Sequence, residues 1–200
     1  MKRMSGVIIS MFIVIFTGFI LSCDTSGTRD SCGEVTYVSS VPKTGQTTSY
    51  EKGDDGDWGK GVAWPVPRFT DNKDGTVTDN LTELIWLKDS NRFDLQTWTD
   101  ALAACNNLAD DGINLTDGSA AGDWRLPNIK EIISLMDYGQ TAPSLPSGNP
   151  FINSGTYLYW SSNTYNDGAS YAFRVNISLG STAVYEKTDF YYVWPVRGGK

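Results

Sequence analysis

Two short apolar stripes of helical period constrain most strongly the fold that this chain can adopt. The first stripe consists of Trp98, Ala101, Leu102, Cys105 and Leu108. The second consists of Ile129, Ile132, Ile133 and Met136. Residues spaced three and four apart lie on one face of an α-helix, so each stripe predicts a short helix with one buried side.

The ends of both helices carry capping signals. Thr97 and Asn128 precede the stripes and are predicted N-caps, with Asp100 and Glu131 three residues further on. Asp110-Asp111-Gly112 is expected to stop the first helix, and Gly139 to stop the second.

Strand-like segments lie on both sides of these helices. Asp74-Gly75, between two β-type stretches within residues 68–79, predicts a hairpin with a type I′ turn. The same stretch lacks a first-position Asp for a calcium loop, because Thr70 stands there. Further strands are expected at residues 84–87, 157–161, 171–176, 182–185 and 190–196. An early hairpin, two helices and a late group of antiparallel strands predict an α+β fold.

The N-terminal residues have the pattern of an export signal. Lys2 and Arg3 precede an apolar run over residues 7–21, which is shorter than the roughly 20 residues that span a bilayer. Ser22-Cys23 then resembles a bacterial lipobox, which predicts lipidation at Cys23 and anchoring in a membrane of the cell envelope. An ordinary secretory signal or an uncleaved anchor is the alternative. We therefore expect a signal peptide at 1–22, a polar flexible tether at 23–40 and one domain at 41–200.

Composition excludes several functions. The chain has no histidine, so no Ser-His-Asp triad, Cys-His pair or His-rich zinc site can form. Its formal charge of −7 becomes −9 when residues 1–22 and their two cations are removed, which argues against binding nucleic acid. No motif indicates an enzyme, a cofactor or a metal site.

Besides Cys23, the predicted lipidation site, the chain has two cysteines, Cys32 and Cys105. In an exported chain a disulfide between them is expected, because such compartments are oxidising. Two unpaired thiols are the alternative, since Cys32 lies in the tether.

Six blocks of the sequence, in order, resemble the Lcl C-terminal domain family, which is named for a collagen-like adhesin of Legionella. They are residues 41–46, 61–89, 97–109, 115–139, 159–165 and 191–199, with GDWRLPN at 122–128 and WPVRGG at 194–199 the most specific. The resemblance implies a C-type-lectin-like fold, with two helices, a small antiparallel sheet, adjacent first and last strands, and a surface of long loops. It also implies a second cysteine near Ile113, which this chain lacks.

The fold group contains calcium-dependent sugar binders and cysteine-dependent oxidases. Leu126-Pro127-Asn128 and Tyr165-Asn166-Asp167 depart from the calcium-ligand motifs of the former, and no cysteine follows Cys105 for the latter. The adhesin prototype is associated with sulfated glycosaminoglycans, which suit an acidic chain poorly.

Residues 163–185 have the composition of an adaptable recognition surface and are the predicted ligand-binding segment. The candidate residues are Asn163, Tyr165, Asn166, Asp167, Tyr171, Arg174 and Tyr185. In the alternative interpretation, Tyr171 and Phe173 alternate into the core. Trp86, Trp124, Trp160 and Trp194 are expected in the core.

Two functions remain open. The first is a lipid-anchored, adhesin-like recognition domain for a carbohydrate or protein ligand. The second is a structural module of the cell envelope that oligomerises through an aromatic face and has no soluble ligand.

Overall fold

The computed structural model describes residues 27–29, 35–37, 41–155 and 157–198, and the chain divides into two compact units, 1–39 and 40–200. In the first unit, β1 (Gly27–Arg29) pairs antiparallel with β2 (Val35–Tyr37), a pairing that the polar composition of this segment does not predict. The apolar run, Cys23 and Cys32 lie outside the described residues. In the part of the chain that is described, no helix has both the length and the apolar character needed to cross a bilayer.

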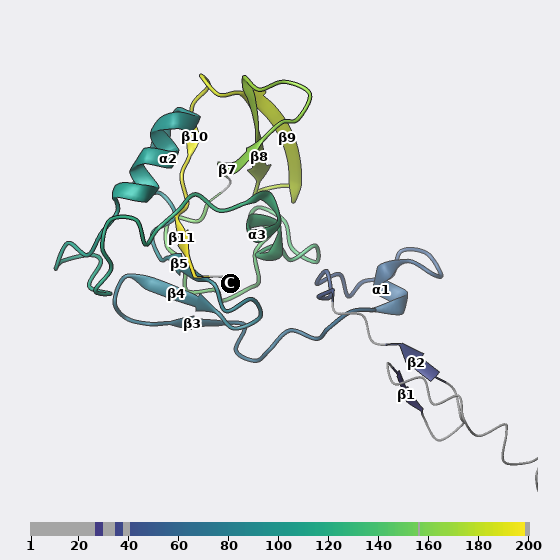
Figure 1. Ribbon diagram of the computed structural model, residues 1–200. Coiled ribbons are helices and arrows are strands. Elements are labelled where there is room, and N and C mark those ends of the chain that lie inside the picture. Colours follow the sequence, from purple (N-terminus) through teal and green to yellow (C-terminus); the bar gives the residue numbers. More distant parts are fainter. Residues whose placement is uncertain (1–26, 30–34, 38–40, 156, 199–200) are drawn as a thin grey trace, which may run out of the picture. The chain divides into compact units, whose positions relative to one another are not determined.

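The described residues of the second unit form two small sheets and three short helices (Figure 1), so the α+β prediction is confirmed. The smaller sheet holds β3 (Phe69–Asp71), β4 (Thr76–Asp79), β5 (Ile85–Leu87) and β11 (Val196–Arg197) in the order β11-β5-β4-β3. All its neighbours are antiparallel. β3, β4 and β5 pair in succession, and β11 joins the free edge of β5. The unit's first and last strands, β3 and β11, are therefore at opposite edges, not adjacent as the resemblance implied.

The β3–β4 hairpin is confirmed, but its predicted turn type is wrong. A type I′ turn requires positive φ at both central residues, whereas here Lys73 and Gly75 have positive φ and Asp74 does not. Asp74 instead accepts hydrogen bonds from the backbone N–H and the hydroxyl of Thr76, and its carbonyl accepts from Thr116 N–H at 2.8 Å. Contact with the 114–116 segment thus shapes a longer loop.

The larger sheet holds β6 (Leu95–Gln96), β7 (Leu158–Thr164), β8 (Tyr171–Asn176), β9 (Ser181–Glu186) and β10 (Tyr191–Tyr192) in the order β6-β10-β7-β8-β9. Only the β10–β7 pair is parallel among these neighbours. The single strand predicted at 190–196 is therefore wrong, since β10 and β11 belong to different sheets. Val193, Trp194 and Pro195 carry the chain from one sheet to the other through the core, and Trp194 Nε1 donates to Leu87 O at 2.8 Å.

The helices are α1 (Asp55–Trp58), α2 (Trp98–Asn107) and α3 (Ile129–Ser134). Both predicted N-caps are confirmed: Thr97 accepts from Asp100 N–H, and Asn128 and Glu131 form a reciprocal capping box. The predicted stop at Gly139 is wrong. The N–H groups of Leu135 and Met136 already bond back within a tightened last turn, and Asp137 N–H bonds to Ser144 O across the neighbouring loop.

Aromatic residues dominate the core. The four tryptophans predicted there, Trp86, Trp124, Trp160 and Trp194, each have 0% of their surface exposed, which confirms that prediction. Trp86 and Trp194 meet edge to face at 5.5 Å between ring centroids. Cys105 lies buried on the inner side of α2, with no disulfide partner among the described residues, and this burial raises the pKa of its thiol. Because Cys32 is outside the described residues, its pairing with Cys105 stays a prediction.

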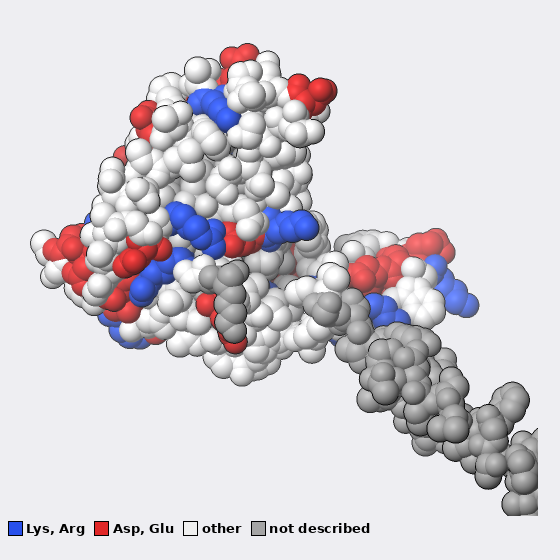
Figure 2. All heavy atoms as spheres, viewed as in Figure 1, with Lys and Arg blue, Asp and Glu red and all other residues white. Residues whose placement is uncertain are grey.

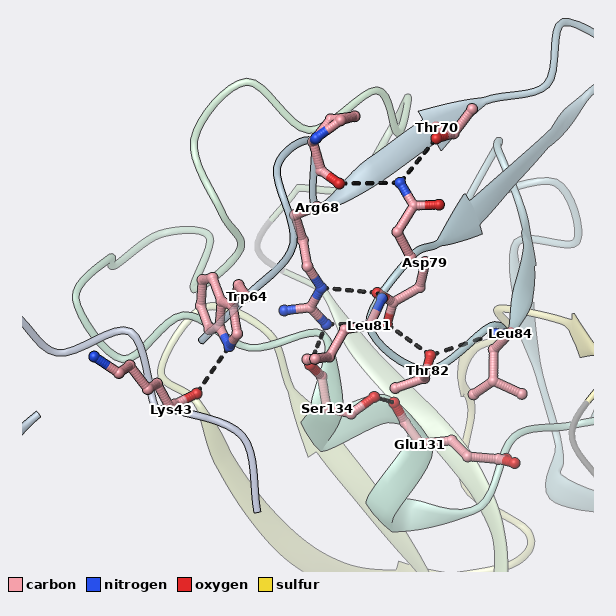
Figure 3. Close-up of polar contacts among 12 residues, drawn as sticks. Lys43, Trp64, Arg68, Thr70, Asp79, Leu81, Thr82, Leu84, Glu131 and Ser134 are labelled. Atoms are coloured by element: carbon pink, nitrogen blue, oxygen red, sulfur yellow. Dashed lines mark hydrogen bonds and ion pairs between the residues drawn. The ribbon is translucent and has the colours of Figure 1, made fainter. Parts of the chain in front are cut away.

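A buried ion pair links the smaller sheet to α3 (Figure 3). Arg68 Nε and Nη2 donate to the two carboxylate oxygens of Asp79 at 2.7 and 2.9 Å. Nη2 also donates to Ser134 O at 2.8 Å. The ring of Trp64 covers the guanidinium at 4.8 Å. Asp79 is fully buried, and further hydrogen bonds from Leu81 N–H and the Thr82 hydroxyl satisfy its carboxylate.

Candidate functional site

The predicted ligand-binding residues divide between the two faces of the larger sheet. Side chains alternate along a strand, so Arg174 shares one face of β8 with Ala172, while Tyr171 lies on the other face with Phe173. Tyr185 is paired with Ala172 across β8 and β9 and is therefore on the Arg174 face. That face packs against α2, because Ala172 and Trp160 belong to the same buried cluster as Ala101 and Cys105.

Asn163 has a structural contact. Its Oδ1 accepts a hydrogen bond at 2.8 Å from the N–H of Ile129, the first residue of α3. This N–H is one of those that a helix start leaves without an internal partner. Asn163 therefore completes the N-terminus of α3 together with Asn128.

Tyr165, Asn166 and Asp167 lie in the turn between β7 and β8. The Tyr165 ring meets Phe173 edge to face at 5.7 Å, while Asn166 and Asp167 are exposed. Across the part of the chain that the structure describes, no three or more Asp, Glu, His or Cys residues are grouped closely enough to hold a metal ion. The three residues form the turn that joins β7 to β8.

Tyr171 is 36% exposed, so the alternative interpretation that placed it in the core is wrong. Ala172 and Val175 fill the core instead, and Phe173 is half-buried. The Tyr171 hydroxyl donates to Glu186 Oε1 at 3.2 Å, and this bond to a carboxylate raises the pKa of the phenol.

Arg174 and Tyr185 are brought together with a third residue, Tyr191. The Arg174 guanidinium carbon lies 4.1 Å from the ring centre of Tyr185 and 5.1 Å from that of Tyr191. The ring centres of Tyr185 and Tyr191 are 5.3 Å apart, and the two rings meet edge to face. The Trp160 ring meets Tyr191 in the same way, with 4.8 Å between the ring centres. Burial raises the pKa of Tyr191, and the nearby Arg174 cation partly opposes this shift. We call Arg174, Tyr185 and Tyr191 the arginine–tyrosine cluster.

Tyr191 was predicted only as part of a strand, and its place in this cluster was not predicted. The signal available was the pair Tyr191-Tyr192, because adjacent residues of a strand point to opposite faces of the sheet, so each face had to receive one tyrosine ring. Tyr192 stacks on Tyr157 at 4.1 Å, and Tyr191 faces Arg174.

Arg174 differs from the other arginines whose side chains the structure describes. Four of them pair with a carboxylate: Arg68 with Asp79, Arg92 with Asp111, Arg125 with Glu131, and Arg197 with Asp117. Arg174 has no such ion pair among the described residues, and its buried Nε has no hydrogen-bond partner there. Figure 2 shows few charged side chains over β7, β8 and β9. The cluster thus holds a partly exposed cation between aromatic rings, with no carboxylate of the described residues within ion-pair distance.

A polar groove of about 730 Å³ next to the β3–β4 loop was not foreseen. Its lining includes Lys73, Lys88, Asp89, Asn91 and Arg92. The sequence signal that could have indicated this groove is the polar run at residues 88–92, directly after β5. Each of the three cations already holds a carboxylate: Lys73 and Lys88 bind Asp71 at 2.7 and 2.9 Å, and Arg92 binds Asp111 at 2.6 Å. These contacts leave the groove close to electrically balanced, unlike the arginine–tyrosine cluster.

Residues 75–197 match the sequence profile of the Lcl C-terminal domain. The chain belongs to the Lcl C-terminal domain family. The matched range runs from the β3–β4 loop to β11, so this Lcl C-terminal domain includes the whole larger sheet and the arginine–tyrosine cluster. The residues around α1 precede the match. No curated protein matches the chain.

Proposed function

We propose that the chain is an exported bacterial lipoprotein of the cell envelope, anchored through Cys23 and facing the periplasm or the exterior. Its Lcl C-terminal domain recognises a carbohydrate or protein ligand through the arginine–tyrosine cluster. The apolar run at 7–21 followed by Ser22-Cys23 supports the anchor. The proposal includes the C-type-lectin-like relationship and assigns no catalytic residue, cofactor or metal.

The observation that carries the proposal is that Arg174 forms no ion pair with a carboxylate of the described residues and that its buried Nε has no hydrogen-bond partner there. Burying part of a guanidinium without a carboxylate is unfavourable unless hydrogen bonds or a ligand compensate. Stacking at 4.1 Å on Tyr185 stabilises the cation and orients its planar group. Arginine and tyrosine are also the residue types most often found at binding hot spots.

The cluster has the chemistry of a recognition site. Tyrosine rings offer flat apolar faces to a sugar ring or to a peptide side chain, and the guanidinium offers N–H donors in a fixed plane. All three residues of the cluster belong to strands β8, β9 and β10. Their backbone is therefore already ordered, which lowers the entropic cost of binding a ligand.

The test uses the full lipidated chain in nanodiscs, probed with a glycan array and with an array of immobilised peptides. For the ligand found, Arg174→Gln is expected to weaken binding about tenfold or more, as for a hot-spot residue. The matched control is Asn166→Ala, which alters an exposed neighbour outside the cluster. Thermal unfolding of both variants verifies that they are folded.

Two results would count against the proposal. One is a ligand whose affinity is the same for wild type and Arg174→Gln. The other is the absence of any ligand combined with concentration-dependent self-association in sedimentation, which would favour the assembly module instead.

A further inference from the structure

A second surface, around α1, lies outside the family match and has no part in the proposed recognition site. We call it the α1 surface. Its members are Val41, Lys43, Tyr50, Lys52, Trp58, Lys60 and Val62, all of them exposed. Tyr50 and Trp58 are 83% and 60% exposed, whereas the four core tryptophans are fully buried. Apolar residues that are exposed singly are common on protein surfaces, whereas a group of them in one place marks an interaction surface.

Short contacts hold these residues together. Val62 N–H bonds to Val41 O at 2.9 Å, and Lys43 N–H bonds to Val62 O at 3.0 Å. The Lys60 ammonium lies 5.3 Å from the ring centre of Trp58. Glycines bring the remaining parts close, since Gly59 lies beside the Lys43 ammonium and Gly53 beside Trp58 Nε1. Lys60 thus lies against Trp58, and the Lys43 ammonium lies beside the glycine that follows Trp58.

The acidic residues of this segment are used internally. Asp54 caps α1 and accepts from the N–H groups of Tyr50, Glu51 and Asp57, which keeps the pKa of its carboxyl below the usual range. Asp57 accepts from Gly53 N–H, and Asp55 accepts from the Thr44 hydroxyl.

The lysines, in contrast, have no carboxylate within ion-pair distance among the described residues, unlike Lys73 and Lys88. Figure 2 shows the result: over the α1 segment, blue side chains lie on either side of an uncharged area, and red side chains gather along one edge.

The α1 surface is fixed to the rest of its unit. Trp64 Nε1 donates to Lys43 O at 2.9 Å, and the Trp64 ring covers Arg68 (Figure 3). Tyr138 N–H donates to Thr44 O at 2.9 Å. Gly45 has a φ of +92°, and a side chain there would collide with Asp137. A ligand of this surface would therefore orient the whole domain.

The place of this surface in the chain favours the lipid bilayer as its binding partner. Residues 24–40 separate it from Cys23, and a chain of that length spans at most about 60 Å. A lipid at Cys23 keeps the α1 surface within reach of the bilayer at all times, so even weak contacts with lipid become favourable. Tryptophan, tyrosine and lysine are also the residues that accumulate at the membrane–water interface.

We propose that the α1 surface rests on the lipid bilayer in which Cys23 is anchored. Trp58 inserts at the level of the headgroups, the exposed Tyr50 and Val62 also contact lipid, and Lys43, Lys52 and Lys60 contact lipid phosphates. This inference rests on the lipid anchor of the proposed function. It makes the domain a membrane-oriented one, with α1 as its base.

The test measures quenching of tryptophan fluorescence by brominated lipids. The full lipidated chain is reconstituted in vesicles of brominated phosphatidylcholine with phosphatidylglycerol, and in the same vesicles without bromine. Quenching is expected for the wild type, and Trp58→Phe is expected to remove most of it. Trp98→Phe, which removes a half-buried tryptophan beside the larger sheet, is expected to retain it.

The lysines are tested in the same assay. Replacing Lys43, Lys52 and Lys60 together by Gln is expected to reduce quenching in vesicles that contain phosphatidylglycerol, whereas Lys130→Gln leaves it unchanged. Added salt is expected to act like the triple replacement, because it screens exposed charges.

The outcomes separate this inference from the anchor itself. A lipidated chain without quenching, or with equal quenching in wild type and Trp58→Phe, overturns the inference alone. The absence of lipid on Cys23 by mass spectrometry overturns both the anchor and the inference. A change in sedimentation of the detergent-solubilised chain on Trp58→Phe, without quenching in the wild type, would assign the surface to a second copy.

Discussion

At the scale of single residues, Asp71 illustrates how the β3–β4 loop is held. Its Oδ2 accepts from the ammonium groups of Lys73 and Lys88 at 2.7 and 2.9 Å, and its Oδ1 accepts from Lys73 N–H. These bonds, with that of Lys73 the largest cause, hold the pKa of the carboxyl well below its usual range. A carboxyl with a lowered pKa stabilises the folded state only while it is ionised.

We predict that Asp71→Asn lowers the free energy of unfolding at neutral pH by about 0.5–1 kcal/mol, as expected for a partly exposed ion pair. Because the folded pKa is lowered, the wild-type advantage should be complete above the unfolded pKa of about 3.9 and vanish as the pH falls through the folded value. Urea unfolding between neutral and acid pH measures this. Asp94→Asn, an exposed carboxylate without a lysine contact, is the control. A difference that persists unchanged in acid would contradict the explanation.

At the scale of elements, α3 has only six residues and depends on partners for its first N–H groups. Asn128 Oδ1 accepts from Glu131 N–H at 3.0 Å, and Asn163 Oδ1 accepts from Ile129 N–H at 2.8 Å. One of these residues was predicted as a cap, and the other as a ligand-binding residue. Both are positioned to stabilise the same helix end.

We therefore predict that Asn128→Ala and Asn163→Ala each lower the free energy of unfolding by about 1 kcal/mol, the usual effect of losing a helix cap or a single hydrogen bond. Asn166→Ala, in the exposed turn, should have no measurable effect. Urea denaturation of the three variants checks this. If Asn163→Ala abolished ligand binding and left stability unchanged, the original assignment to the ligand site would be restored.

At the scale of the whole molecule, the Arg68–Asp79 pair joins the smaller sheet to α3 and to the Trp64 segment. Both side chains are almost completely buried. Removing one partner of such a pair leaves an uncompensated buried charge, whereas replacing both by apolar groups does not.

The expected effect of Asp79→Asn is a loss of about 3–5 kcal/mol in the free energy of unfolding. The double replacement Arg68→Met with Asp79→Leu should recover part of this loss. The recovery is only partial because the Leu81 N–H and the Thr82 hydroxyl lose the carboxylate that accepts their hydrogen bonds. Lys73→Gln, which breaks an exposed pair, provides the comparison. If Asp79→Asn and Lys73→Gln lowered the thermal stability equally, burial of the Arg68–Asp79 pair would not be the reason for its contribution to stability.

Features set by neighbours in the sequence could be predicted for this chain. Caps at Thr97 and Asn128 and the stripes of α2 and α3 depend on residues three or four positions apart, so the sequence determines them directly. The α+β class follows from the same local patterns. The four core tryptophans lie in strongly patterned segments, and burying so much apolar area is favourable in any compact arrangement of them.

Only the tertiary structure decided the rest. The turn at Asp74-Gly75 depends on a contact with Thr116, and the division of residues 190–196 between two sheets depends on the pairing of β5 with β11. Arg174 and Tyr191 are seventeen residues apart and meet because β10 and β8 both lie beside β7. The sequence by itself determined α2, α3, the β3–β4 hairpin and the tryptophans of the core, because those follow from local geometry and burial. Which polar groups are left without a partner depends on how distant segments pack, and that decides where a ligand can bind.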